Sequence, residues 1–309
     1  MTTVPAIEIG GTHVSAALVD LAQRRVVAGS RNREPLDANG PAGVILGSVL
    51  HCARRLGVSR GATWGAAVPG PFDFAAGVGR YEGVAKLASL NGVDVGRALR
   101  AGLPDDSRIV FLNDADAFVI GEWAAGAAMG HDRVVGITLG TGIGSGFLAG
   151  GLTVEGGPDV PPDGEVHFLS IDDRPLEDVV SRRAIIARYA TLTGARDGEP
   201  APDVREIAAL ARGGDPDARR AIQEPLQALG RALDPWLERF RATAVVIGGA
   251  IAASWDLVEP AIRDGIGATI AVLRAQLPDD AALIGAAQYA AREPADVGRP
   301  RDAAPDVGE

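Results

Sequence analysis

The chain has 309 residues, enough for two domains of ordinary size, and its apolar and charged fractions of 47% and 23% are those of a globular protein. Its formal net charge of −10 argues against a nucleic-acid-binding protein, because such a protein needs a basic face to neutralise phosphates. Aromatic residues make up only 5%, so the core must consist mainly of Ala, Val, Leu and Ile.

Cys52 is the only cysteine, which excludes an internal disulfide and a cysteine-rich zinc site. The first residues show no basic segment followed by a long apolar run, and the chain has no uncharged apolar stretch of about 18 residues. We therefore expect a cytoplasmic protein without a signal peptide or a membrane-spanning helix.

The first half of the chain reads as short apolar strands separated by turns, with two helices. A glycine turn between the first two strands suggests a hairpin. Residues 41–56 carry apolar side chains at helical spacing. The predicted strands are 6–9, 14–19, 25–30, 62–68 and 108–112, and the predicted helices are 41–56 and 115–128.

The second half alternates strands with longer helices. Residues 150–164 are rich in Gly and Pro and are predicted to form a loop. From Arg292 onward the low apolar content predicts a disordered tail. The predicted strands are 134–139, 147–149 and 244–247, and the predicted helices are 175–190, 203–212, 215–240 and 250–273 (as one or two helices). Residues 282–291 are a final apolar segment.

This order of elements predicts an α/β protein of two domains. The pattern changes near residues 113–122, so the predicted domain boundary lies there. We expect a first domain over residues 1–119, a second over 120–291 and the tail over 292–309.

Three glycine turns follow three apolar strands, at 10–12, 140–144 and 248–249. Glycine lets a backbone approach phosphate oxygens closely, and successive N–H groups can form an anion-binding nest. Thr12 and Thr141 add hydroxyl donors. One such turn would be weak evidence, but three at strand ends favour a phosphate site over purely structural turns.

The competing phosphate motifs do not fit. The chain has no Gly-x-x-x-x-Gly-Lys-Ser/Thr, and Lys86, its only lysine, is not in a glycine turn, which excludes a P-loop NTPase. The glycines at 140–146 run into an apparent strand at 147–149 instead of opening a helix, which argues against a dinucleotide-binding fingerprint.

Asn113 and Asp114 lie between a predicted strand and a predicted helix. Either could simply cap the helix. A carboxylate at the carboxyl end of a strand can also accept the proton of an attacking hydroxyl, and Asn113 beside it could hold a neighbouring sugar hydroxyl.

A second polar group follows at Glu165, His167 and Glu177. The two glutamates could accept hydrogen bonds from adjacent sugar hydroxyls, and His167 could donate one. If this segment is a strand, residues two apart face the same side, so Glu165 and His167 could reach one ligand. The alternatives are a solvated edge strand with a helix N-terminal acid, or a metal site at His167, for which the four histidines give no ligand spacing.

Together these segments resemble the ROK family of sugar kinases and related repressors, in the actin-like ATPase superfamily, over about residues 5–291. The resemblance implies a two-domain, ribonuclease H-like fold with a cleft between domains. It implies a kinase that transfers the γ-phosphoryl group of ATP, with Mg²⁺, to a hydroxyl of a hexose, typically at the 6-position, with glucose as the default. It also implies a homodimer with a sugar or cyclitol substrate. The segments that carry it are 8–12, 68–71, 113–117, 139–146, 164–167, 176–177 and 247–250.

The resemblance also implies roles for single residues. Asp114 is the expected catalytic base, and Glu8 the expected contact of Mg²⁺ through water. The expected substrate-binding residues are Gly70, Asn91, Asn113, Asp114, Glu165, His167 and Glu177. The expected ATP-binding residues are Gly10, Gly11, Thr12, Gly140, Thr141, Gly142, Gly144, Gly248 and Gly249.

Three departures from the family pattern concern the expected Mg²⁺ contact and the substrate site. Glu8 stands where the family usually has Asp, and Val166 separates Glu165 from His167 where the family usually has a glycine. Many members also carry a His and Cys cluster for zinc, which one cysteine cannot supply, so we expect no structural zinc. An amino sugar, fructose or a carbocyclic pseudo-sugar is therefore an alternative to glucose.

The rival reading from another class is a sugar-responsive regulator. Family repressors carry an N-terminal helix-turn-helix domain, and the first predicted phosphate strand begins within ten residues of Met1, which leaves no room for one. A non-catalytic sugar sensor remains the alternative.

Overall fold

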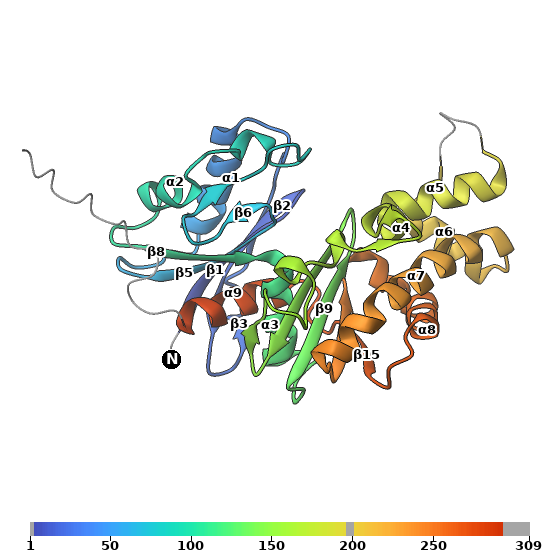
Figure 1. The fold of residues 1–309 in the computed structure, drawn as a ribbon. Coiled ribbons are helices and arrows are strands. Elements are labelled where there is room, and N and C mark those ends of the chain that lie inside the picture. Colours follow the sequence, from blue (N-terminus) through green and yellow to red (C-terminus); the bar gives the residue numbers. More distant parts are fainter. Residues whose placement is uncertain (1–2, 196–200, 293–309) are drawn as a thin grey trace, which may run out of the picture. The chain divides into compact units, whose positions relative to one another are not determined.

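The computed structural model describes residues 3–195 and 201–292, and Figure 1 shows its elements. The chain forms two compact units, one of residues 3–114 with 286–292 and one of residues 115–285. The predicted boundary after residue 119 therefore lies inside helix α3 (Asp114–Ala125), and helix α9 (Ala281–Arg292) belongs to both units. Arg292, predicted to begin the tail, ends α9, and residues 293–309 lie outside the described residues.

The first unit is built on a six-stranded sheet of order β3-β2-β1-β5-β8, with β4 also paired to β2. The predicted third strand, 25–30, is wrong beyond Val26, because the chain turns through Gly29 at φ 76° and pairs with β2 again as β4. The strands are β1 (Thr3–Ile9), β2 (His13–Asp20), β3 (Arg25–Val26), β4 (Asn32–Pro35), β5 (Thr63–Val68) and β8 (Arg108–Asn113).

Strands β1, β5 and β8 run parallel and end at one edge of this sheet. Glu8 pairs with Ala67, and Val68 pairs with Asn113. The residues that follow these strands therefore start from the same edge, where ligands of open α/β sheets commonly bind.

Two helices and several short elements complete the first unit. Helix α1 buries Ile45, Val49 and Cys52 in the core, and α2 begins with Asp94 accepting a hydrogen bond from the Arg97 N–H. These elements are α1 (Ala42–Arg54), α2 (Val95–Gly102), β6 (Phe72–Asp73), β7 (Val78–Gly79) and the 3₁₀ turn η1 (Ala88–Leu90).

The second unit contains a five-stranded sheet of order β11-β10-β9-β14-β15. Two expectations are corrected here. Strand β10 begins at Ile143, so the glycine segment 140–146 is a three-residue turn followed by strand. Residues 271–273, predicted to be helical, belong to strand β15, whose Val272 pairs with Val245. The strands are β9 (Arg133–Leu139), β10 (Ile143–Ala149), β11 (Leu152–Thr153), β14 (Ala244–Gly248) and β15 (Ala271–Arg274).

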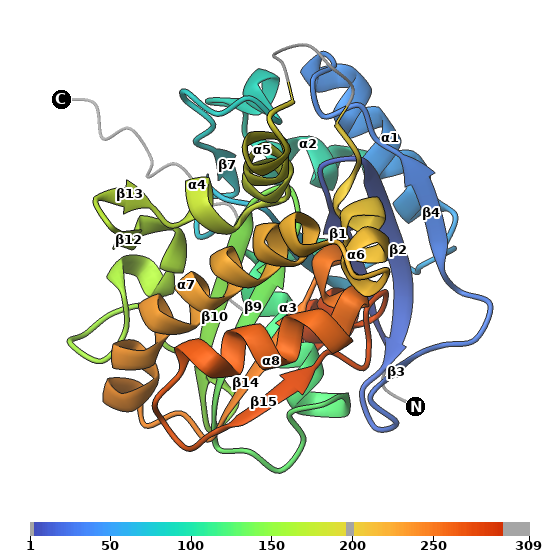
Figure 2. The same ribbon diagram turned by 90° about the vertical axis from the view of Figure 1, so that its right-hand side faces the viewer.

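Helices pack on this second sheet, and Figure 2 shows α7 and α8 lying side by side. The predicted helix 175–190 is divided at Ser181, whose hydroxyl accepts a hydrogen bond from the Ala184 N–H and so starts a new helix. The remaining elements are α4 (Glu177–Val180), α5 (Arg182–Thr193), α6 (Val204–Arg212), α7 (Pro216–Phe240), α8 (Trp255–Gly265), β12 (Ser170–Ile171), β13 (Arg174–Pro175) and the 3₁₀ turns η2 (Pro162–Gly164), η3 (Val166–Phe168) and η4 (Ala250–Ser254).

Glycines allow close packing along helix α9. A Cβ on Gly285 would overlap the Ala117 carbonyl oxygen, and a Cβ on Gly121 would overlap that of Ala281. On the first unit's half of the helix, a Cβ on Gly65 of β5 would overlap the Ala286 carbonyl oxygen. Among residues 3–195 and 201–292, every helix is too short or too polar to cross a bilayer.

Candidate active site

The predicted base, Asp114, is the first residue of α3 and follows β8 at the edge where the parallel strands end. The charge of Asp114 acts on Tyr81, which is 2% exposed and donates its hydroxyl to the Pro69 carbonyl oxygen at 2.8 Å. Burial, and then the charge of Asp114, raise the pKa of Tyr81 well above its usual range. The tyrosine is therefore a neutral donor that ties the turn after β5 to the surroundings of Asp114.

The first glycine turn joins β1 to β2. The Gly10 N–H donates to the His13 carbonyl oxygen at 2.9 Å, and Thr12 is exposed with its hydroxyl 3.3 Å from His13 Nδ1. This turn follows β1, so it starts from the same sheet edge as Asp114. The structure thus brings the first predicted phosphate turn and the predicted base onto one edge.

Glu8 precedes this turn and is half-buried. No group of three or more His, Cys, Asp and Glu side chains among the described residues is placed to hold a metal ion. Mg²⁺ needs fewer protein ligands, because one or two carboxylates and substrate phosphates commonly bind it. A carboxylate beside a glycine turn fits that donor set.

In the second unit, two predicted phosphate segments lie against each other. Gly249 has φ 84°, and a Cβ there would overlap the backbone of Leu139, the residue before the Gly140 turn. Only glycine fits this position, since it needs both a left-handed backbone and a close approach. The turn is held further by the Arg182 N–H, which donates to the Gly140 carbonyl oxygen at 2.9 Å.

Glu177 joins the same group. Its Oε2 accepts a long hydrogen bond of 3.4 Å from the Ile143 N–H, and a Cβ on Gly142 would lie 2.5 Å from that oxygen. The predicted sugar-binding glutamate therefore touches the predicted phosphate turn.

Gly144 has a different position from its neighbours in the turn. It lies in β10 opposite Thr138, and a Cβ on it would come within 2.6 Å of the Thr138 hydroxyl oxygen. Packing between the strands explains the glycine, and its contact with a nucleotide stays a prediction.

Glu165 and His167 form a pair, with 2.8 Å between Glu165 Oε2 and His167 Nδ1. The strand expected here is wrong: Glu165 joins two 3₁₀ turns, η2 and η3. The Ser145 hydroxyl holds these turns against β10, because it donates to the Gly164 carbonyl oxygen at 2.8 Å and accepts from the Val166 N–H at 2.9 Å.

The Glu165 hydrogen bond raises the pKa of His167, and the charges of Glu165, Glu177 and Asp163 act in the same direction against burial. The imidazole therefore holds its proton to higher pH than a free histidine. Such a group can donate a hydrogen bond to a ligand oxygen while the carboxylates around it accept from hydroxyls.

Two other predicted substrate residues, Gly70 and Asn91, lie in turns of the first unit. Gly70 follows Pro69 in the turn after β5, and the Gly70–Pro71 peptide is cis. Asn91 is exposed at the end of η1, where its N–H donates to the Ala88 carbonyl oxygen.

Two residues at the site were missed from the sequence, Tyr81 and Lys86. Nothing in the pattern around Tyr81 distinguishes it. Lys86 could have been singled out from the sequence, because it is the only lysine among 30 lysine and arginine residues. In the structure its side chain lies against Gly11.

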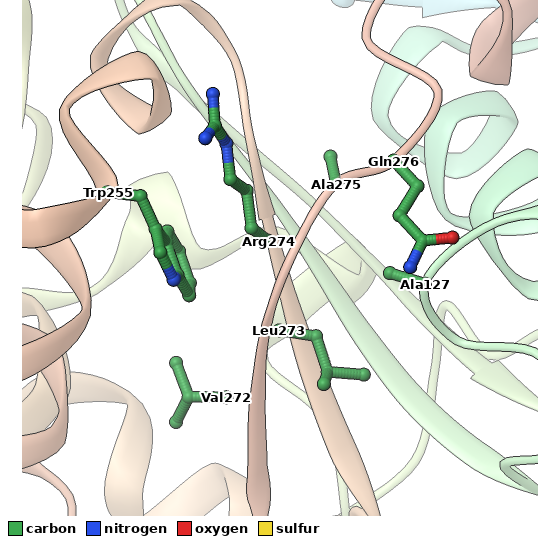
Figure 3. Close-up of a pocket in the computed structure, with 7 residues that line it drawn as sticks. All are labelled: Ala127, Trp255, Val272, Leu273, Arg274, Ala275 and Gln276. Atoms are coloured by element: carbon green, nitrogen blue, oxygen red, sulfur yellow. The ribbon is translucent and has the colours of Figure 1, made fainter.

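A pocket of about 470 Å³ in the second unit lies outside this set of residues (Figure 3). It is close to the end of β14, because Arg274 pairs with Ile247 and the Ala275 N–H donates to the Ile247 carbonyl oxygen. The Trp255 indole and the Arg274 guanidinium project beside it. Its lining residues are Ala127, Trp255, Val272, Leu273, Arg274, Ala275 and Gln276.

Comparison with solved structures first defines the class. Mixed α/β units with glycine turns at strand ends form the actin-like ATPase fold that ROK sugar kinases share. A ROK family glucokinase from Streptomyces griseus, solved in complex with glucose and AMPPNP, has a TM-score of 0.73 and 25% identity over 94% of this chain and 100% of that one.

The sequence then defines the family. The ROK family matches residues 4–293, and the chain belongs to it. A glucokinase of Thermotoga maritima is 31% identical over 206 residues, which are 58% of this chain and 64% of that protein, so the match spans just under two thirds of the relative. Kanosamine kinase of Amycolatopsis mediterranei is 26% identical over 297 residues, which are 90% of each chain.

Proposed function

We propose that the chain is an ATP-dependent sugar kinase that phosphorylates a hydroxyl of a hexose or a hexose-like polyol. One observation carries the proposal: Asp114 lies at the sheet edge from which the Gly10–Thr12 turn also starts. The similarity to two glucokinases, one of them solved with glucose and AMPPNP, supports the reaction class and the phosphoryl donor.

In this proposal the sugar hydroxyl attacks the γ-phosphorus of ATP. The bond from phosphorus to the bridging oxygen breaks, ADP leaves with the electron pair, and Asp114 takes the hydroxyl proton. Catalysis consists mainly of positioning and charge neutralisation. Mg²⁺, held through Glu8, would supply charge neutralisation at the phosphates.

The binding roles follow the two groups of residues. The sugar-binding residues proposed in the first unit are Gly70, Asn91 and Asn113. Those proposed in the second unit are Glu165, His167 and Glu177. The proposed phosphate turn of the first unit is Gly10–Thr12. In the second unit, Gly140–Gly142 is the proposed phosphate turn, and Gly248 and Gly249 are proposed to contact the adenosine side.

Replacing Asp114 with Asn tests the base. We expect kcat to fall by about 100- to 10,000-fold, because the amide cannot accept the proton, while binding of AMPPNP and sugar stays close to wild type by calorimetry. ADP release with glucose is the assay. Asp105→Asn is the matched control, since Asp105 is exposed and paired with Arg60 at 3.4 Å. Near-normal turnover by Asp114→Asn would show that another group is the base.

The substrate has a second candidate class, an amino sugar or a carbocyclic pseudo-sugar. The match to kanosamine kinase over 90% of both chains favours it, as does Val166 between Glu165 and His167. A panel of glucose, fructose, kanosamine and C7-cyclitols, ranked by kcat/KM, decides between the classes. If no compound in the panel is phosphorylated but one binds, the chain is a sugar sensor.

A further inference from the structure

Lys86 lies directly on the first glycine turn. Its Nζ is 2.8 Å from the position that a Cβ of Gly11 would occupy, and its Cδ and Cε are 3.2 and 3.4 Å from the same point. The last part of the side chain therefore runs along the Gly11 backbone, in space left by the missing side chain of the glycine.

The backbone around Lys86 is held firmly. Leu87 adopts the left-handed conformation at φ 60°, is 1% exposed, and donates its N–H to the Ala38 carbonyl oxygen at 2.7 Å. That conformation is unfavourable for a residue with a Cβ, so the surrounding packing must impose it. At the other end of the segment, the buried Tyr81 is hydrogen-bonded to Pro69. The ammonium is thus presented from a fixed loop.

Lys86 is half-buried and forms no ion pair within the part of the chain that the structure describes. A half-buried ammonium beside a glycine turn attracts an anion. Lysine acts on phosphate as a compact point charge, whereas arginine binds through a planar fork. A chain that otherwise uses only arginine has its single lysine here.

We propose that Lys86 binds the terminal phosphate of the nucleotide at the Gly10–Thr12 turn and neutralises the charge that moves during phosphoryl transfer. The ammonium acts by hydrogen bonding and charge, together with the N–H groups of the turn and the Thr12 hydroxyl. The inference rests on the proposed function for the identity of the ligand as ATP.

A spectroscopic test uses the uniqueness of the residue. Reductive methylation with ¹³C-formaldehyde labels Lys86 and the α-amino group only, and the Lys86→Arg protein assigns the remaining signal. We expect AMPPNP to shift the dimethyl-lysine resonance clearly and ADP to shift it much less, because ADP lacks the terminal phosphate. An unmoved resonance at saturating AMPPNP overturns the proposal, and equal shifts with both nucleotides overturn the assignment to the terminal phosphate.

Kinetics supply the second test. Lys86→Met keeps the length of the side chain and removes its charge, so kcat/KM for ATP should fall by about 100-fold or more. The Kd of AMPPNP should rise more than that of ADP, and the Kd of the sugar should stay within about threefold. Lys86→Arg should recover part of the loss. Arg60→Met, which removes an exposed charge paired with Asp105 and Asp106, is the control. A kcat/KM for ATP in Lys86→Met equal to that of the wild-type protein would overturn the proposal.

The two proposals fail separately. If the wild-type protein phosphorylates sugar and Lys86→Met does so equally well, only the role of Lys86 is wrong. If the wild-type protein phosphorylates nothing in the panel, the proposed function fails, and the response of the lysine resonance to AMPPNP and ADP still decides whether Lys86 binds a terminal phosphate. Should Lys86→Met not fold, the resonance and the Lys86→Arg kinetics decide.

Discussion

Single residues set the protonation state of the candidate site. The hydrogen bond that His167 donates to Glu165 raises the pKa of His167, so the folded chain holds this proton more tightly than the unfolded chain, in which the pKa is about 6.5. The pair therefore stabilises the fold fully below pH 6.5, and this contribution is lost as the pH rises through the folded pKa.

We expect Glu165→Gln to lower the pKa of His167, because the amide cannot provide the negative charge. Histidine resonances followed by NMR from pH 5 to 9 measure it, with His167→Gln used for assignment. The Glu165→Gln protein should also lose about 1–2 °C in Tm at pH 6 and close to nothing at pH 9, since both residues are partly exposed. An unchanged His167 titration in Glu165→Gln would show that the other carboxylates set the pKa.

The sequence predicted that Glu165 and His167 face the same side and could reach one ligand, for a reason that the structure corrects. Alternation along a strand would have placed both on one side, whereas two 3₁₀ turns and the Ser145 hydroxyl bring them together. Residue types carry hydrogen-bonding capacity, which can be read from the sequence. The path of a Gly- and Pro-rich segment depends on distant partners such as Ser145, and this path cannot be read from the sequence.

Secondary-structure elements determine where the glycine turns lie. Gly249 and Gly130 allow the effect of an added side chain to be compared at two positions. Gly249 and Gly130 share a positive φ, 84° and 85°. A Cβ on Gly249 would overlap the Leu139 backbone, whereas nothing lies within 4 Å of one on Gly130. Both substitutions meet the cost of a positive φ, and only the one at Gly249 also meets the close approach of another strand's backbone.

Gly130→Ala should lower the free energy of unfolding by about 1–2 kcal/mol, the conformational cost alone. Gly249→Ala should lower it by at least about 3 kcal/mol, because the two strand ends must also separate. Urea denaturation measures both. Gly249→Ala should in addition weaken AMPPNP binding, and equal losses of stability in the two variants would contradict the close approach.

The positions of strands that coincide with apolar runs were predicted well. Strands β1, β2, β5, β8, β9 and β14 fall where the apolar runs are. Strand β15 was taken for helix because its stretch from Ala271 to Arg274 is short, and its pairing with β14 is set by the sheet. The split at Ser181 was missed because a serine inside a helical pattern becomes a cap only when the chain bends there.

The whole molecule consists of two units whose chain segments do not coincide with the predicted domains. The first unit includes residues 286–292, which are far from the rest of it in sequence. The sequence marked residues 282–291 only as a final apolar segment and gave no sign that they form α9, whose second half packs against β5. That contact depends on Gly65, whose missing side chain admits the Ala286 backbone.

Gly65→Ala should therefore destabilise the first unit by about 1–3 kcal/mol, because the added methyl group overlaps a carbonyl oxygen of α9. Trp64 is buried next to it and is the only tryptophan of this unit, so its fluorescence in a protein with Trp123, Trp236 and Trp255 replaced by Phe reports this unit alone. Gly47→Ala is the contrast: this exposed position in α1 has nothing within 4 Å, and alanine should stabilise by about 0.5–1 kcal/mol. Equal effects from both would refute the packing of α9 on Gly65.

The burial of Cys52 in α1 has a practical consequence. Burial, reinforced by the charge of Glu34, raises the pKa of this thiol to about 11, so roughly one molecule in ten thousand carries a thiolate at neutral pH. The protein is thus inert towards maleimides without any prior engineering. A cysteine introduced at any exposed position becomes a unique attachment point for a dye, a spin label or a solid support.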